Sequence, residues 1–317
     1  MDTFGRHFSV SLFGASHEPT VGAVLRGVPA SLALREDDFT ADLLRRKSGR
    51  PGTTPRIEDD LPVLDDRRAE EGTLTITFAN RNYRDADYSD FTSIPRPGHA
   101  DFVALKRYGS LLNGRFSGRM TLPLVAAGVV AKKIIAPLRV EASLVEIGGV
   151  KASDTDAVTR LLEETAREGD SLGGVVECHC TGVPAGLGEP FFDSLESLLA
   201  HAVFSIPGIR GIEFGDGFAA SRMKGSEHND PIIDADGHTV RNGAGGINGG
   251  LSNGNPIVFR TAVKPTSSIR KVQTTFDFKA GRMVDYSVPG RHDTCFALRV
   301  PPVVEAVTAC VFADLLI

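Results

Sequence analysis

Tryptophan is absent from the 317 residues, and only four are cysteines. Four thiols in so long a chain exclude a disulfide-stapled scaffold. No apolar stretch approaches the roughly 18 residues that a membrane span requires. Basic residues are not in excess either, because 35 Lys and Arg stand against 40 Asp and Glu for a net charge of −5. We therefore expect a soluble protein with neither membrane nor nucleic acid as partner, although a local basic pocket stays possible.

The first residues and the cysteines carry information on compartment and metal binding. Residues 1–6 lack the apolar segment of a signal peptide, which favours a cytoplasmic protein with reduced thiols. Cys178-His179-Cys180 lacks the second ligand pair of a usual zinc site. The alternation in 175–181 instead predicts a strand, with both thiols on one face and His179 on the other. We expect no metal site.

Strands and helices are interspersed without a regular βαβ rhythm, which favours an α+β fold. Without an internal repeat or a linker, we expect one domain over 1–317. Residues 80–97 are predicted to form a long ordered loop, the segment 208–265 is rich in glycine, and Ser153 is predicted to cap a helix. Strands are expected at 7–13, 21–25, 73–78 and 175–181, and helices at 36–47, 99–108, 117–135, 153–167, 192–203 and 303–316.

Four segments combine residue types that can do chemistry. His17 follows a tight turn after a strand, and His99 follows a Pro-Gly turn at a helix start. Lys264 precedes three hydroxyl residues, and 290–293 places a cation, an imidazole and a carboxylate on one loop. No G-x-G-x-x-G opens a helix after the first strand and no P-loop motif occurs, so neither a Rossmann site nor a P-loop NTPase is expected.

Lys264 and the hydroxyls at 266–268 form a credible phosphate cradle, because a cation supplies charge and hydroxyls supply directed donors. The glycines at 245–250 would let the backbone approach a flat ligand. Each feature also has a structural interpretation. A lone histidine after a strand is usually a satisfied structural residue, hydroxyl runs often form turns, and glycine-rich segments are often loops.

Taken together and in order, these segments resemble the chorismate synthase family. The resemblance runs from Phe4-Gly5 to 302–306, and its motifs include 13–17, 42–47, 96–101, 169–174, 186–190, 211–218, 225–230, 244–250, 264–269 and 290–293. It implies two antiparallel sheets sandwiching central helices, and a homotetramer. It also implies anti-1,4 elimination of phosphate from 5-enolpyruvylshikimate 3-phosphate, giving chorismate for aromatic amino acid biosynthesis. The reaction requires reduced FMN without net redox change.

The resemblance also implies roles for single residues. His17 would donate a proton to the departing phosphate, His99 would set the protonation of the reduced flavin, and Asp293 would help to remove the substrate proton. Residues matched to substrate or NADP binding are Arg46, Arg50 and Arg119. Residues matched to FMN binding are Arg115, Phe116, Ser117, Pro207, Gly208, Gly249, Lys264, Pro265, Thr266, Ser267, Ser268 and Arg291.

The sequence departs from the family pattern at Glu18, Phe116, Met120 and Thr294. Glu18 adds a negative charge next to His17. A catalytically idle or weakened FMN-binding paralogue is therefore the alternative to the lyase. A flavin reductase that takes hydride from NADPH is a third hypothesis, although no residue in the sequence specifically favours it. Retention of His17, His99 and Asp293 favours the lyase.

Overall fold

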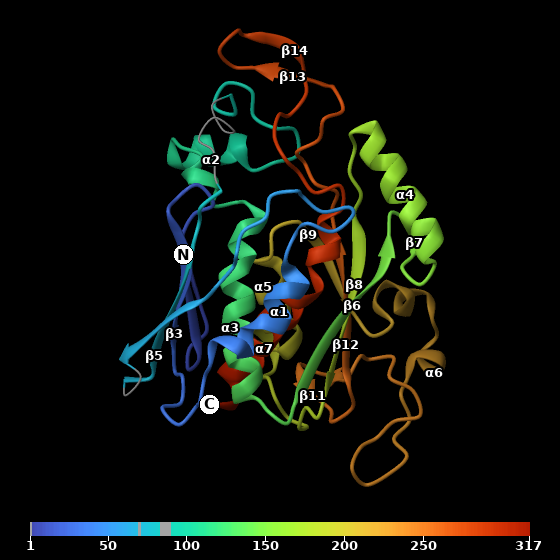
Figure 1. Ribbon diagram of the computed structural model, residues 1–317. Helices are drawn as coiled ribbons and strands as arrows, with labels where there is room; N and C mark the ends of the chain where they lie inside the picture. The colour runs from blue at the N-terminus through green and yellow to red at the C-terminus, as the bar shows by residue number, and fades with distance from the viewer. Residues whose placement is uncertain (1, 69–70, 83–89) are drawn as a thin grey trace.

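Two five-stranded antiparallel sheets enclose a layer of helices in the computed structural model, which describes residues 2–68, 71–82 and 90–317 (Figure 1). The apolar side chains of both sheets and of the helices between them form one continuous cluster. Each sheet therefore buries one face against the same helices. The predicted α+β sandwich of two antiparallel sheets around central helices is confirmed.

The first sheet has the strand order β1-β2-β3-β5-β4. Its longest pairing joins β3 and β5, where Arg26 lies opposite Thr73 and Thr20 opposite Ala79. In β5 every second residue is buried, as expected for a strand with one face on the core. The strands are β1 (Thr3–Phe4), β2 (Ser9–Gly14), β3 (Thr20–Arg26), β4 (Val63–Arg68) and β5 (Thr73–Ala79).

The second sheet has the order β7-β6-β8-β12-β9. Strand β8 contains the three residues that were weighed as a metal motif. Cys178 and Cys180 are fully buried and unpaired, whereas His179 is exposed on the opposite face, so the strand prediction is confirmed. The strands are β6 (Arg139–Ile147), β7 (Val150–Lys151), β8 (Gly174–Thr181), β9 (Ile209–Phe214) and β12 (Ile257–Val263).

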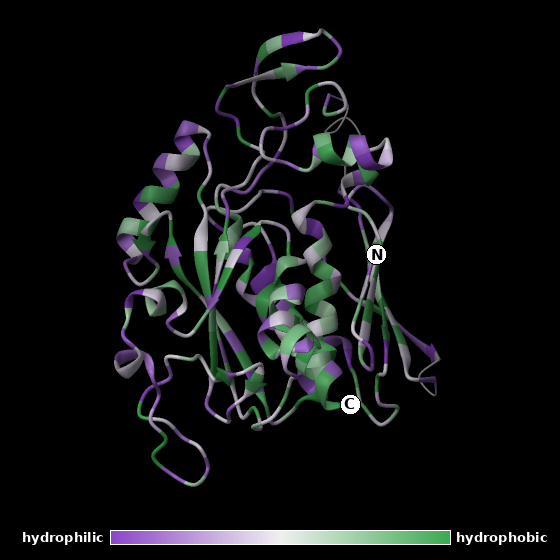
Figure 2. Ribbon diagram, turned by 180° about the vertical axis from the view of Figure 1, so that it is seen from behind, coloured by the Kyte–Doolittle hydropathy of each residue, from purple (hydrophilic) through white to green (hydrophobic). Residues whose placement is uncertain are grey.

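The central layer consists of α1 (Thr40–Arg46), α3 (Thr121–Ile134), α5 (Leu195–Phe204) and α7 (Pro301–Leu316). Figure 2 shows the longer helices of this layer, α3, α5 and α7, coloured mainly as apolar segments. Helices α3 and α7 approach closely at Gly128, where an added Cβ would lie 2.3 Å from the Ala306 Cβ. This confirms that the small residues of 117–135 permit tight helix packing. Both helices begin at the same end of the layer (Figure 1).

The remaining elements surround this sandwich. Asp154 rather than the predicted Ser153 caps α4, because its carboxylate accepts from the Ala157 N–H at 3.0 Å. Part of the predicted loop 80–97 lies outside the described residues. The elements are α2 (Asp101–Tyr108), α4 (Thr155–Glu168), α6 (Gly225–His228), β10 (Ile247–Asn248), β11 (Leu251–Ser252), β13 (Gln273–Asp277) and β14 (Arg282–Tyr286). Short 3₁₀ helices also lie at 36–39, 112–114, 118–120, 191–193, 217–222 and 296–299.

A helix needs sufficient length and apolar character to span a membrane. Among the described residues, no helix combines the length and the apolar character that a bilayer span demands.

Candidate active site

A cavity lies at the end of the helix layer where α3 and α7 begin. Loops that follow β2, α1 and β12 contribute to it, together with the loops that precede α2, α3, β9 and α7. Predicted site residues that line it are His17, Arg46, His99, Phe116, Ser117, Arg119, Pro207, Gly208, Lys264, Pro265, Thr266, Ser267, Ser268, Arg291 and Asp293. Segments separated by up to 276 positions in sequence thus line the same cavity. Residues that act together in one reaction must lie this close in space.

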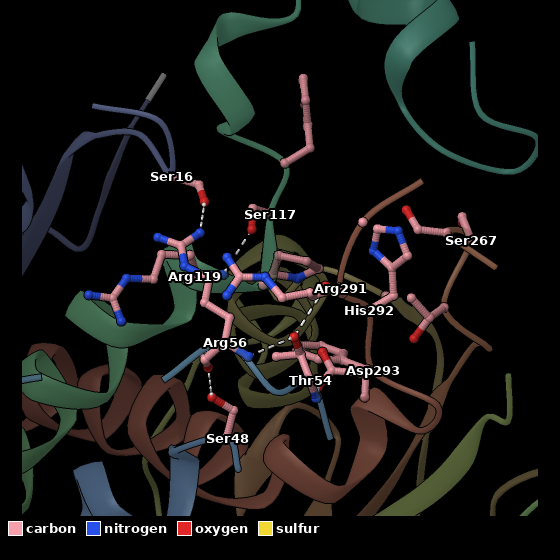
Figure 3. A pocket seen from close by; sticks show the side chains of 18 of the residues that line it. Ser16, Ser48, Thr54, Arg56, Ser117, Arg119, Ser267, Arg291, His292 and Asp293 are labelled. Carbon is pink, nitrogen blue, oxygen red and sulfur yellow. Dashed lines mark hydrogen bonds between the residues drawn. The ribbon is translucent and has the colours of Figure 1, made fainter. Parts of the chain in front are cut away.

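The cavity carries an excess of positive charge. Of the described residues that line it, seven are Arg or Lys and three are Asp or Glu. Figure 3 shows Arg56, Arg119 and Arg291 among the side chains that line the cavity, between Ser16 on one side and Ser267 on the other. The N-terminal ends of α3 and α7 add positive dipole ends at the same place. The charge and the dipoles both favour an anionic ligand.

A buried cluster of arginines forms the floor. Arg46, the last residue of α1, donates to Asp60 at 3.0 Å and to the Thr121 hydroxyl at 3.3 Å. Arg119 pairs with the second oxygen of Asp60 and donates to Asn80 Oδ1 at 2.9 Å. Burial lowers the pKa of Arg46, and the neighbouring Arg299 adds to the effect. The Nε of Arg46 is buried and has no hydrogen-bond partner among the described residues.

Asp293 is held at the edge of this floor. Its carboxylate accepts from the Thr54 backbone N–H at 2.8 Å and from Arg299 Nη1 at 3.2 Å. Arg299 also donates from Nε to the backbone carbonyl of Arg46 at 2.9 Å. One side chain therefore connects the arginine floor to the predicted catalytic carboxylate.

His17 lies on the opposite wall, next to Ser16. The turn that carries it begins at Gly14, whose φ of 76° leaves no room for a side chain, because a Cβ would lie 2.2 Å from the Thr20 carbonyl. The His17 backbone N–H donates to Asn113 O at 2.9 Å, which joins the turn to the segment before α3. Arg56 continues the wall by donating to Ser16 at 3.2 Å and to Glu58 at 2.8 Å.

His99 sits in a charged hydrogen-bond network. Its Nδ1 lies 2.6 Å from Asp101 Oδ1, and Arg96 donates three hydrogen bonds to the same carboxylate, two from its guanidinium group and one from its backbone N–H. The pairing with Arg96 and His99 outweighs the effect of burial and holds the pKa of Asp101 far below its ordinary value. An ionised Asp101 can only accept a hydrogen bond, so Nδ1 of His99 must carry the proton in this contact. Nε2 is then the ring nitrogen that can bind a group in the cavity. Burial lowers the pKa of His99, while Asp101 opposes the shift.

The segment 264–268 forms a polar corner beside His99. Lys264 Nζ and the Ser267 hydroxyl both donate to the Gly98 carbonyl, at 2.9 and 2.8 Å, and they contact each other. Ser268 accepts from Arg96 at 3.1 Å. The Thr266 hydroxyl is buried and has no partner within the described part of the chain. A buried hydroxyl of this kind costs free energy unless a ligand satisfies it.

Three predicted ligand-binding residues lie outside the cavity lining. Arg115 turns back to the first sheet and donates to the carbonyls of Leu12 and Gly14. Arg50 donates to the carbonyls of Arg45 and Leu298. Gly249 connects β10 to β11 at the far end of the second sheet (Figure 1). The glycines at 245 and 246 pack against backbone near 215 and 256, so their close approach serves the protein's own chain.

Glu18, one of the departures from the family pattern, does not face the cavity. Its carboxylate accepts from Asn113 Nδ2 at 3.2 Å, and it does not appear among the described residues that line the site. Asn113 therefore binds this carboxylate outside the described cavity lining.

Sequence reasoning missed several residues that organise the site. They lie in or beside motifs that were recognised, but their partners come from distant segments. Two features of the sequence could have indicated some of these residues. They are the charged run 56–60 after α1 and Arg299, which lies two residues before the start of α7. The missed residues are Ser48, Thr54, Arg56, Glu58, Asp60, Asp101 and Arg299.

An α+β sandwich whose cation-lined cavity gathers three imidazoles and three carboxylates has the features of an enzyme active site that favours an anionic small molecule. The family model described as chorismate synthase matches residues 8–317. The chain belongs to the chorismate synthase family.

Individual proteins support the same assignment. The chorismate synthase of Chitinophaga pinensis is 53% identical over 326 residues, which span 100% of this chain and 97% of the relative. The chorismate synthase of Aeropyrum pernix is 42% identical, over 100% of this chain and 93% of its own length. A crystal structure of a chorismate synthase has a TM-score of 0.74 at 24% identity, over 99% of this chain and 92% of that chain. That structure supports the fold.

Proposed function

We propose that the chain is a carbon–oxygen lyase that eliminates phosphate from 5-enolpyruvylshikimate 3-phosphate to give chorismate. The carrying observation is that His17, His99 and Asp293 line one cavity together with the arginine floor. A substrate with one phosphate and two carboxylates matches the excess of seven basic over three acidic side chains among the described lining residues. The 53% identical relative carries the same name as the family.

The residues at one side of the cavity fit reduced FMN. Thr266 offers a buried hydroxyl with no partner among the described residues, and Lys264 and Ser267 can exchange the Gly98 carbonyl for a phosphate. Phe116 and Pro207 supply apolar surface for a flat ring. When bound, reduced FMN would lend electron density to the substrate as phosphate leaves and regain it as the ring hydrogen departs, with no net redox change.

The arginine floor would bind and orient the substrate. Arg46 and Arg119 are fixed by Asp60 before any ligand arrives, so little ordering is required at the moment of reaction. Arg56 is likewise fixed by Glu58. Positively charged groups held in place favour the developing charge of the leaving phosphate more than flexible lysines would.

The imidazoles and Asp293 would handle protons. His17 would transfer a ring proton to an oxygen of the departing phosphate, which is the task of a general acid. Asp293, held by Thr54 and Arg299, would accept the hydrogen lost from the substrate as a proton. His99, with its Nδ1 proton held by Asp101, would keep Nε2 available for a hydrogen bond in the cavity.

The test is an anaerobic assay of chorismate formation with chemically reduced FMN. Turnover supports the lyase. Tight binding of FMN and substrate without turnover would indicate the idle paralogue, and turnover with NADPH and oxidised FMN would add a flavin reductase. We also propose a single domain, a homotetramer and a cytoplasmic location, as the family resemblance implies; light scattering after size-exclusion chromatography tests the tetramer.

A further inference from the structure

Arg46 and Arg119 reach the cavity floor from different elements and meet at one carboxylate. Arg46 ends α1, whereas Arg119 lies in the 3₁₀ helix at 118–120 before α3. Each arginine takes a different oxygen of Asp60, so the carboxylate bridges them. The side chains of Arg46, Arg119 and Asp60 are 2%, 6% and 4% exposed. The bridge is therefore largely removed from solvent.

Asp60 has a backbone φ of 56°, a left-handed value that residues other than glycine rarely adopt. Such a conformation costs most residues free energy, although Asp and Asn adopt it more readily than other non-glycine residues. Its neighbour Asp59 is 73% exposed and approaches Arg81 only at 3.9 Å. The left-handed φ of Asp60 therefore accompanies the turn that brings its carboxylate to the two arginines, whereas Asp59 stays exposed.

The bridge leaves donors of the arginines uncommitted. Two guanidinium groups share one carboxylate, so this group of three keeps a net positive charge. Arg46 Nε is buried without a partner among the described residues. Burial alone would raise the pKa of Asp60, but Arg46 and Arg119 hold it below its ordinary value, so the carboxyl remains ionised. A buried, partly uncompensated cationic pair is stable when an anion completes it.

We propose that Asp60 is a positioning residue that fixes Arg46 and Arg119 in the geometry that receives the anionic substrate. The inference rests on the proposed function, because the anion is taken to be 5-enolpyruvylshikimate 3-phosphate. Asp60 itself touches no reacting atom. Its contribution is that both guanidinium groups are ordered before the substrate binds, which lowers the cost of binding.

Charge and geometry make opposite predictions for the loss of Asp60. If only charge mattered, removing a carboxylate near an anion site would tighten substrate binding. If positioning dominates, binding weakens, because the two cations repel each other and lose their common anchor. The direction of the change therefore separates the two explanations.

Asp60→Asn and Asp60→Gly test the proposal with the backbone conformation preserved. Asparagine tolerates the left-handed region, and glycine adopts it without strain. Asn can accept from one arginine but presents an amide donor to the other, whereas Gly anchors neither. Asp59→Asn is the matched control, because it removes an adjacent carboxylate that is exposed.

The measurements are KM and kcat with reduced FMN, and calorimetric binding of 5-enolpyruvylshikimate 3-phosphate to the flavin-free protein. We expect KM and Kd to rise about tenfold in Asp60→Asn and about a hundredfold in Asp60→Gly, the size of charge-assisted hydrogen bonds. The kcat at saturation should stay within about threefold of the wild type, and Asp59→Asn should match the wild type.

Unchanged or tighter binding in both variants would overturn the proposal. So would a fall in kcat with unchanged KM, or loss of the folded state in both variants by circular dichroism, since Asp60 would then serve the fold. A wild-type protein that binds the substrate but does not turn it over would refute the proposed lyase, while the calorimetric comparison would still decide the role of Asp60.

Discussion

The carboxylate of Asp293 lies 3.2 Å from the guanidinium of Arg299 and also accepts from the Thr54 N–H at 2.8 Å. Two groups from different segments thus fix this carboxyl group at the cavity wall. Arg299 is itself 8% exposed and contacts the carbonyl of Arg46. Arg299 therefore links the carboxylate of Asp293 to the backbone at Arg46.

Replacement of Asp293 by alanine should lower kcat at least ~10²-fold, the usual loss for a group that transfers a proton. The measurement is chorismate formation under anaerobic conditions with saturating reduced FMN. Asp285→Ala is the control, because Asp285 lies on the exposed ribbon β13–β14 and bonds only to Thr274 among the described residues. A near-normal rate in Asp293→Ala would remove its proposed role as base.

His17→Ala should also lower turnover at least ~10²-fold, because phosphate would depart without a proton donor. Binding of the substrate to the flavin-free protein should change much less than kcat, since the arginines supply the charge. His179→Ala is a suitable control, because His179 projects from β8 at 49% exposure and bonds to Glu177. An equal loss in both variants, or none in His17→Ala, contradicts the assignment.

His99 should titrate below pH 6.5, and Asp101→Asn should move its pKa further down. Burial lowers the pKa of His99, and Asp101 is the group that partly restores it. In the variant, the carboxylate no longer neutralises the positive charge of Arg96, which lies next to the His99 ring. That charge disfavours the protonated imidazolium and lowers the pKa of His99. Nuclear magnetic resonance of labelled histidines, assigned with His99→Gln, follows the titration.

The control for this titration is Asp170→Asn. Asp170 also has a lowered pKa, but its cause is Lys271, outside the cavity. The His99 curve should coincide with that of the wild type in this variant. A His99 pKa that stays constant or rises in Asp101→Asn would show that the 2.6 Å contact does not govern its protonation.

Much of the fold was predictable because its signals are local. Strict alternation at 175–181 identified a strand with buried thiols, and the apolar run at 303–316 identified a core helix. The cap of α4 was misplaced by one residue, since Ser153 and Asp154 are both good caps and only backbone geometry selects between them.

The site was predictable where motifs carry it and not where tertiary pairs do. Asp60 is the last of three acidic residues in a row, a pattern that normally indicates a solvated surface, and only the fold shows that Glu58 and Asp60 turn inward while Asp59 stays exposed. Arg115 stands in a recognised motif, yet two backbone carbonyls of β2 bind its guanidinium. Long side chains choose partners across the fold, which sequence spacing does not determine.

Glu305 supports a prediction about stability rather than catalysis. It lies in α7 with a side chain 3% exposed, and it accepts from Arg45, from Lys132 and from the Ala142 N–H. These contacts join α1, α3, α7 and β6. Burial alone would raise the pKa of Glu305, but Arg45 and Lys132 hold it below the ordinary value of 4.5.

Because the folded-state pKa is depressed, the unfolded chain binds the proton first as pH falls. The stabilisation from Glu305 is therefore complete above about pH 4.5 and is lost as pH falls through the folded-state pKa. Glu305→Gln should lower the free energy of unfolding at pH 7 by about 1.5–3 kcal/mol, the size of a hydrogen bond to a charged group, since Arg45 and Lys132 lose Glu305 but keep Asp42. Its stability should then fall less steeply than that of the wild type between pH 5 and pH 3.

Denaturant unfolding across this range measures both effects, with Glu141→Gln on the exposed face of β6 as control. Parallel acid limbs in the wild type and Glu305→Gln would show that the buried carboxylate contributes no pH-dependent stability.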